Sequence, residues 1–185
     1  MGTNKALLEV GGRRMLDRTA NLLHPLVDDL FLVADDPAPF AGLGLPIIPD
    51  IHAGRGVAGG IHAALAHAAH PLVLCVACDM PHIERRVVEL LLNSALPGAI
   101  DAVLPRIDGR PEPLLAVYAR SARTGFEKAI CAGRLRVMEA IDGLRVHFID
   151  DAALRIADPD LRSFVNVNTP KELAAARISA ARGTS

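Results

Sequence analysis

Two aspartates stand where the sequence could place carboxylates beside a bound metal ion. Asp50 and Asp79 each follow a short apolar run, which is typical of a buried strand that ends in polar residues. Ligands of an open parallel sheet bind beyond the carboxyl ends of its strands, so both side chains could project into one crevice. Such a pair is typical of a site for Mg²⁺, which adds water and substrate phosphates to complete its shell. The alternative is that either aspartate caps the turn after its strand.

A lysine and a group of glycines are candidates for binding phosphate. Lys5 could neutralise a phosphate, although a lone lysine near the start of a chain is more often simply solvated. Gly54, Gly56, Gly59 and Gly60 stand at the start of an Ala-rich segment that is predicted to be helical. Backbone N–H groups at such a helix start could cradle a phosphate or a base. The same glycines would equally suit a loop followed by close helix packing.

Cysteine and histidine carry no predicted chemistry. Cys75 and Cys78 have Cys-x-x-Cys spacing, but a zinc site needs two further ligands, and Cys131 alone does not supply them. The pair also follows the pattern of a core strand rather than a loop that opens a helix, so we expect buried, inert thiols. None of the seven histidines is assigned a role.

Predicted strands and helices alternate along the chain. The strands are expected at residues 30–34, 47–48, 72–77, 102–105, 113–118, 146–149 and 164–167. Helices are expected at residues 15–23, 57–69, 85–96, 121–132 and 137–141, and a final helix is expected to begin at Thr169-Pro170 with threonine as its N-cap. No repeat or interior linker is evident, so residues 1–185 are predicted to form one α/β domain with a mostly parallel, doubly wound sheet.

Charge and hydropathy exclude two classes of partner. The formal net charge of the 185 residues is −1, which gives no electrostatic case for binding nucleic acid. No apolar run reaches the length of a membrane span, and Met1 is followed by polar residues rather than by a signal peptide. We therefore expect a cytoplasmic protein that binds neither nucleic acid nor a membrane.

Short motifs are spread over nearly the whole chain, from Gly2 to about Ala176. They are Met1-Gly2, Asn4-Lys5-Ala6-Leu7-Leu8, Pro49-Asp50, Val57-Ala58-Gly59, Cys78-Asp79-Met80-Pro81, Glu112-Pro113-Leu114, Gly133-Arg-Leu-Arg-Val-Met138 and Phe164-Val-Asn-Val-Asn-Thr-Pro-Lys-Glu-Leu173. Together they resemble the molybdenum cofactor guanylyltransferases, also called the molybdopterin-guanine dinucleotide biosynthesis protein A family. The last motif is the most specific, whereas Cys-Asp-Met-Pro is shared across the superfamily of small nucleotidyltransferases. The resemblance implies a Rossmann-like nucleotidyltransferase fold for residues 1–185.

The resemblance also implies a reaction. The terminal phosphate of molybdopterin would attack the α-phosphorus of GTP, which transfers GMP to the cofactor and releases pyrophosphate. By similarity, Lys5 would bind the nucleotide phosphates, Asp50 and Gly59 would contact the nucleotide, and Asp79 would contact it and hold Mg²⁺. Lys5 and Asp79 are thus the expected catalytic residues. Because the attacking phosphate is already an anion, the reaction needs charge neutralisation and positioning rather than a general base.

Three further residues are assigned to the molybdopterin substrate. Asn166 and Asn168 alternate along a predicted strand, so they would share one face and could hydrogen-bond the pterin. An Asx turn between strand and helix is the alternative. Arg136 could contact the phosphate of the pterin substrate, or it could be an exposed arginine at a helix start. Molybdoenzyme-maturation proteins are candidate partners.

The family opens with a strand and a Leu-Ala-Gly-Gly phosphate loop, and neither precedes Lys5. We therefore expect an N-terminally truncated chain, with a true start about twenty residues upstream, the length of a strand and a phosphate loop. Two alternatives follow for the function. The protein could be a molybdenum cofactor cytidylyltransferase, or another sugar or cofactor nucleotidyltransferase. It could also be a non-catalytic remnant that binds the cofactor or a partner protein without turnover.

Overall fold

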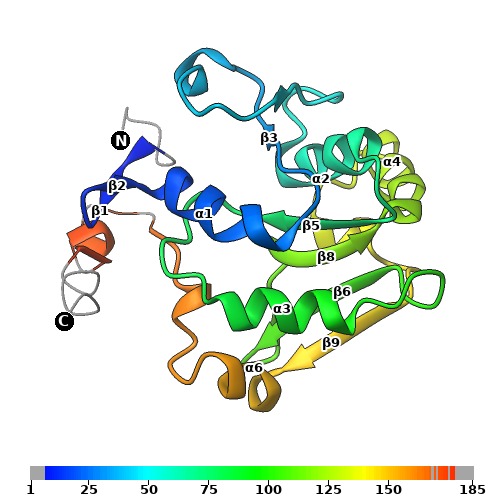
Figure 1. Ribbon diagram of the computed structural model, residues 1–185. Helices are drawn as coiled ribbons and strands as arrows, with labels where there is room; N and C mark the ends of the chain where they lie inside the picture. The colour runs from blue at the N-terminus through cyan, green and yellow to red at the C-terminus, as the bar shows by residue number, and fades with distance from the viewer. Residues whose placement is uncertain (1–6, 168, 170, 175, 178–185) are drawn as a thin grey trace. The chain divides into compact units, whose positions relative to one another are not determined.

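The computed structural model describes residues 7–167, 169, 171–174 and 176–177 (Figure 1). The chain divides into two compact units. The terminal unit comprises residues 1–30, 77–89 and 154–185, and the sheet unit comprises residues 31–76 and 90–153. Helices α3 (Arg85–Ser94) and α6 (Asp151–Ala157) each run from one unit into the other. The assignment of residues 1–185 to a single nucleotidyltransferase domain stays a prediction.

The sheet unit contains two sheets. One is the parallel pair β3 (Leu32–Val33) and β4 (Ile47–Ile48), and the other holds β5 (Leu72–Val76), β6 (Ala102–Ile107), β7 (Arg110–Pro111), β8 (Leu115–Ala119) and β9 (Val146–Asp150). Strands β5 and β6 are both antiparallel to β8, which lies between them, and β9 is parallel to β6. Thus β5, β6 and β9 share one direction and β8 opposes them. The predicted α/β class is confirmed, with a mixed central sheet.

Helices cover this sheet with small and apolar side chains. Helix α2 (Gly56–His67) packs against α4 (Arg123–Cys131), and α5 (Val137–Ala140) packs against both (Figure 1). The core between helices and sheet includes Ile61, Leu65 and Phe126, and the Phe126 ring meets the Tyr118 ring edge-on at 5.6 Å. All five residues of β8 are buried, as expected for a strand with neighbours on both sides. The 3₁₀ turns of this unit are Ala38–Phe40 and Arg120–Ala122.

The terminal unit begins with a hairpin of β1 (Glu9–Val10) and β2 (Arg13–Arg14). Its turn needs two residues with positive φ, which Gly11 (61°) and Gly12 (75°) supply without strain. Helix α1 (Met15–Leu23) and a 3₁₀ turn at His24–Leu26 follow. The side chains of Val10 and Met15 are fully buried together with Val167.

The segment at residues 164–167 differs from its predicted strand. A 3₁₀ turn at Arg162–Phe164 replaces the start of the strand, after Leu161 in the left-handed region at φ 52°. The buried Asp158 carboxylate fixes this turn, because it accepts hydrogen bonds from both the backbone N–H and the hydroxyl of Ser163, each at 2.7 Å. Local polar contacts thus outweigh the alternating pattern on which the strand prediction relied.

The other predicted elements agree with the structure to within a few residues. The predicted N-cap at Thr169 is confirmed, because Thr169 Oγ1 accepts from the Glu172 N–H at 3.2 Å and the Glu172 carboxylate accepts from the Thr169 N–H at 2.8 Å. Cys75 is buried as expected, and burial raises the pKa of its thiol to about 12. Cys78 lies beyond the end of β5 and is half-buried, with its pKa raised to about 11, first by burial and then by Asp79. In the described part of the chain, no helix is both long and apolar enough to cross a membrane.

Candidate functional site

Asp50 and Gly59 lie against each other in the sheet unit. Asp50 follows β4 and starts the loop that leads to α2, and its Oδ1 accepts a hydrogen bond from the His52 N–H at 2.8 Å. Gly59 is a buried residue of α2, and a Cβ added to it would stand 2.6 Å from Asp50 Oδ2. Only glycine allows the carboxylate to approach the helix so closely. Asp50 therefore forms the turn that its alternative interpretation predicted, and it also contacts the second predicted nucleotide-binding residue.

Two further glycines shape the junction between this loop and α2. Gly54 and Gly56 have φ values of 74° and 60°, a region that other residues rarely adopt. Helix α2 begins after Arg55, and the Arg55 side chain makes no capping hydrogen bond to the start of the helix. A helix start without such a cap in general leaves N–H groups for water or a ligand. The cradle expected at this helix start, next to the Asp50 carboxylate, stays a prediction.

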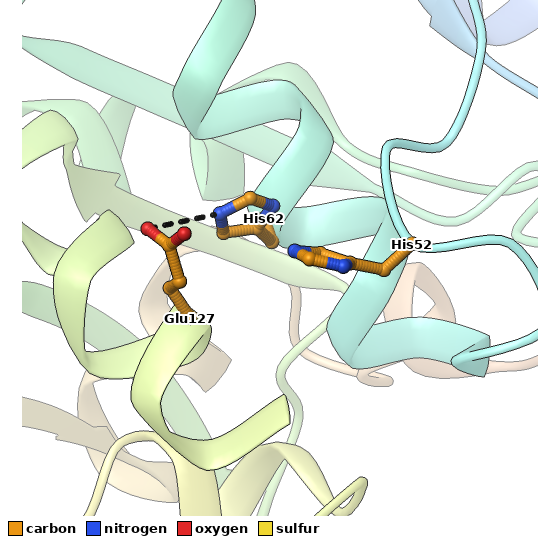
Figure 2. A group of neighbouring side chains, drawn as sticks. All are labelled: His52, His62 and Glu127. Carbon is orange, nitrogen blue, oxygen red and sulfur yellow. Dashed lines mark ion pairs between the residues drawn. The ribbon is translucent and has the colours of Figure 1, made fainter. Parts of the chain in front are cut away.

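Two histidines and a glutamate meet on the same part of the sheet unit (Figure 2). His52 lies in the loop after Asp50, His62 on α2 and Glu127 on α4. The His62 side chain is only 4% exposed, and its Nε2 lies 3.8 Å from Glu127 Oε2. The two imidazole rings are 4.8 Å apart between centroids. We call these three residues the His-His-Glu cluster.

Burial is the main cause of a lowered pKa for His62. The neighbouring His52 and Arg123 lower this pKa further, whereas Glu127 and Asp50 oppose the shift. This lowered pKa favours the neutral form of His62. Its contact with Glu127 at 3.8 Å then lacks the positive charge that an ion pair needs.

Asp79 lies in the terminal unit beside the Asn166 segment. The carbonyl of Asp79 accepts a hydrogen bond from the Val167 N–H at 2.9 Å. Asn166 is the residue before Val167, and its Oδ1 is buried with no hydrogen-bond partner among the described residues. Two of the predicted motifs, Cys78–Pro81 and Phe164–Leu173, are thus joined by a backbone hydrogen bond. Since Asp50 belongs to the other unit, a shared crevice for the two aspartates stays a prediction.

Comparisons with known proteins agree on one family. Residues 1–152 match the family described as MobA-like NTP transferase domain. The molybdenum cofactor guanylyltransferase of Desulfosudis oleivorans is 36% identical over 98% of this chain and 90% of its own length. The chain belongs to the MobA-like NTP transferase family. A probable molybdenum cofactor guanylyltransferase of Pelotomaculum thermopropionicum is 35% identical over 97% of this chain and 87% of its own length.

Solved structures of other proteins match the fold of this chain. Molybdopterin-guanine dinucleotide biosynthesis protein A of Archaeoglobus fulgidus matches with a TM-score of 0.86 and 32% identity, over 98% of this chain and 92% of that one. The 2-C-methyl-D-erythritol 4-phosphate cytidylyltransferase of Thermus thermophilus matches with a TM-score of 0.71 at 20% identity, over 97% and 95% of the two chains. The second match shows a common fold only. The predicted Rossmann-like nucleotidyltransferase fold and the resemblance are both confirmed.

The remaining site residues of this MobA-like NTP transferase fall into two groups. Arg136 is exposed at the start of α5, where no described side chain holds it, as its simpler interpretation predicted. Lys5 and Asn168 lie outside the described residues. The roles assigned to all of these residues stay predictions.

The His-His-Glu cluster was missed in the sequence. Its members come from a loop and two separate helices, and no motif spacing joins them. One weak signal was available: Gly59 and His62 are three residues apart, so they share a face if residues 57–69 form a helix. A histidine on the face that carries a predicted ligand contact could have been singled out on that ground.

Proposed function

We propose that this protein transfers GMP from GTP to the molybdopterin cofactor and releases pyrophosphate. The observation that carries the proposal is the 36% identity to a protein named molybdenum cofactor guanylyltransferase, over 98% of this chain. The close contact of Asp50 with Gly59 adds a local reason, because both residues come from motifs assigned to the nucleotide.

Asp50 and α2 would bind the nucleotide. One carboxylate oxygen of Asp50 is held by the His52 N–H, and the other lies against Gly59. The carboxylate is thereby fixed as an acceptor for the hydroxyl or N–H groups of a nucleoside. The uncapped N–H groups at the start of α2 favour negative charge, as do helix N-termini in general. Lys5 is proposed to neutralise the triphosphate.

The residues around Asp79 fit a magnesium ion. Hard cations prefer oxygen ligands, and Asp79 offers a carboxylate beside the segment that carries the buried, unpartnered Asn166 Oδ1. Asp79, with or without Asn166, would hold the ion. Bound Mg²⁺ would supply neutralising charge to the triphosphate. Asn166 Oδ1 could alternatively accept a hydrogen bond from the pterin, and Asn168 and Arg136 are proposed to contact the same substrate.

The chain's own part in the chemistry is positioning. The molybdopterin phosphate is already an anionic nucleophile, so no side chain needs to remove a proton from it. Asp50 would orient the nucleoside end of GTP, and the residues on the pterin side would align the attacking phosphate with the α-phosphorus. Correct alignment of two bound reactants can supply a large part of a rate enhancement.

Release of pyrophosphate tests this proposal. Purified protein is incubated with molybdopterin, MgCl₂ and either GTP or CTP, and pyrophosphate is measured enzymatically. We expect release with GTP to exceed release with CTP at least about tenfold, which corresponds to about 1.4 kcal/mol of discrimination. A preference for CTP would replace the proposal by a cytidylyltransferase. Binding of the cofactor without release from either nucleotide would favour the non-catalytic alternative. The proposal of a cytoplasmic protein is separate and needs fractionation of cells.

A further inference from the structure

The His-His-Glu cluster has the composition of a transition-metal site. The three candidate ligand atoms, one from each side chain, all lie within 4.8 Å of one another. Figure 2 shows the Glu127 carboxylate facing one edge of the His62 ring, while the His52 ring approaches from the other side. Imidazole nitrogens and a carboxylate are the ligands that Zn²⁺ and its neighbours in the first transition row prefer.

The imidazoles of this cluster have unmet hydrogen-bonding capacity. His52 Nε2, His62 Nδ1 and His62 Nε2 are buried and have no partner among the described residues. The His62 side chain is only 4% exposed, and its unpartnered Nε2 is the atom nearest Glu127. Buried polar atoms are rarely left in this state, so each one calls for an explanation. A bound ion would use one nitrogen of each histidine and also the Glu127 charge, and it would leave the second nitrogen of His62 without a partner.

We propose that His52, His62 and Glu127 bind a divalent transition-metal ion, in the first instance Zn²⁺. Tetrahedral zinc at about 2.0–2.1 Å from its ligands needs ligand atoms about 3.4 Å apart. The His62–Glu127 separation of 3.8 Å is already close to this value. The three ligand atoms lie within 4.8 Å of one another, so His52 and the 49% exposed Glu127 side chain would have to move closer to bind one ion. Three protein ligands leave the fourth position to water or another small ligand.

The charges around the cluster favour a cation. Two carboxylates, those of Glu127 and Asp50, act on His62, and the Arg123 guanidinium acts in the opposite sense. The two carboxylates carry negative charge that a bound cation could use.

This site is distinct in chemistry from the proposed magnesium site. Mg²⁺ prefers oxygen ligands such as Asp79, whereas the imidazoles of His52 and His62 select a softer ion. An ion here would join the loop after Asp50 to both α2 and α4. Its consequence would be to fix the loop that carries the Asp50 carboxylate against Gly59.

Metal titration of the untagged full chain tests the proposal without any nucleotide. The protein is stripped with a chelator and titrated with ZnCl₂ by calorimetry, and then with CoCl₂ while the visible spectrum is recorded. We expect one equivalent of Zn²⁺ and a Co²⁺ spectrum of tetrahedral nitrogen and oxygen ligation. His52→Gln and Glu127→Gln, which alter half-buried or exposed side chains, should each weaken binding at least about tenfold.

His147→Gln is the matched control, because His147 is exposed on β9 of the same unit. It should bind Zn²⁺ as the wild type does. The proposal is overturned if the wild type binds no Zn²⁺, or if both cluster variants retain wild-type affinity. It is also overturned if the Co²⁺ spectrum shows thiolate charge-transfer bands, which would assign the ion to cysteine. Since no outcome depends on GTP, failure here leaves the proposed transferase activity untouched.

Discussion

Replacing Gly59 by alanine should damage the contact between Asp50 and α2. The new Cβ would stand 2.6 Å from Asp50 Oδ2 and 3.1 Å from the Arg55 Cβ, so the loop has to move. Such overpacking typically costs about 1–3 kcal/mol, whereas glycine to alanine inside an unobstructed helix gains about 0.5–1 kcal/mol. The net expectation is a loss of about 1 kcal/mol, which lowers the melting temperature of a protein of this size by about 2–4 °C.

Gly60 is the matched control for this experiment. It lies next to Gly59 in α2, has an ordinary φ, and a Cβ added to it meets nothing within 4 Å. Gly60→Ala should therefore stabilise the protein by about 0.5–1 kcal/mol. Urea unfolding followed by circular dichroism measures both variants. The reasoning is refuted if Gly59→Ala is as stable as Gly60→Ala.

A double-mutant cycle identifies the Asp50 carboxylate as the cause. In an Asp50→Ala background the nearest clashing atom, Asp50 Oδ2, is gone and only the Arg55 Cβ at 3.1 Å remains, so Gly59→Ala should cost less than it does in the wild type. Coupling energies between contacting residues are typically about 0.5–3 kcal/mol. Additive effects would show that the clash lies elsewhere. If Asp50 binds the nucleotide, the displaced loop in Gly59→Ala should also raise the KM for GTP.

Three further predictions concern the pH dependence of stability, a buried hydroxyl and the thiols. Burial lowers the pKa of His82 below 6.5, so the unfolded state takes up a proton at a higher pH than the native state does. The free energy of unfolding should therefore fall as the pH drops below 6.5. His82→Gln should flatten this pH dependence, which urea titrations at successive pH values measure. Ser163→Ala removes a buried hydroxyl that donates to Asp158 at 2.7 Å, and it should cost about 1–3 kcal/mol; an unchanged melting temperature would contradict this. In the native protein a thiol reagent should modify the exposed Cys131 quickly and the buried Cys75, with its pKa of about 12, only on unfolding; equal rates would refute this.

Local patterns predicted most of the elements but not the direction of every strand. The helical spacing of residues 15–23 corresponds to α1 at Met15–Leu23, and the apolar run 72–77 corresponds to β5 at Leu72–Val76. Neither pattern indicates how strands pair, so the reversed direction of β8 became known only from its register with β5 and β6. The predicted strand at residues 164–167 was wrong because the local hydrogen bonds from Ser163 to Asp158 outweighed the alternating pattern.

The site was predictable where a motif carries it and hidden where only folding creates it. Asp50 and Gly59 were both singled out from their motifs, but the 2.6 Å approach that requires glycine depends on how the loop returns onto α2. The His-His-Glu cluster combines a loop with two separate helices, so the sequence offered only the weak signal that Gly59 and His62 share a helix face. Its members meet because α2 packs against α4 in the sheet unit.

Direct detection of the product tests the central claim best. The purified protein is incubated with GTP, molybdopterin and MgCl₂, and the product is identified by mass spectrometry, with Asp79→Asn as the matched variant. We expect the guanine dinucleotide form of the cofactor from the wild type and at least about a hundredfold less from Asp79→Asn, because loss of the carboxylate would weaken the hold on the Mg²⁺ that neutralises transition-state charge. Two results would contradict this expectation. One is formation of the cytosine dinucleotide instead of the guanine dinucleotide when CTP is also present, and the other is equal yields from the wild type and Asp79→Asn.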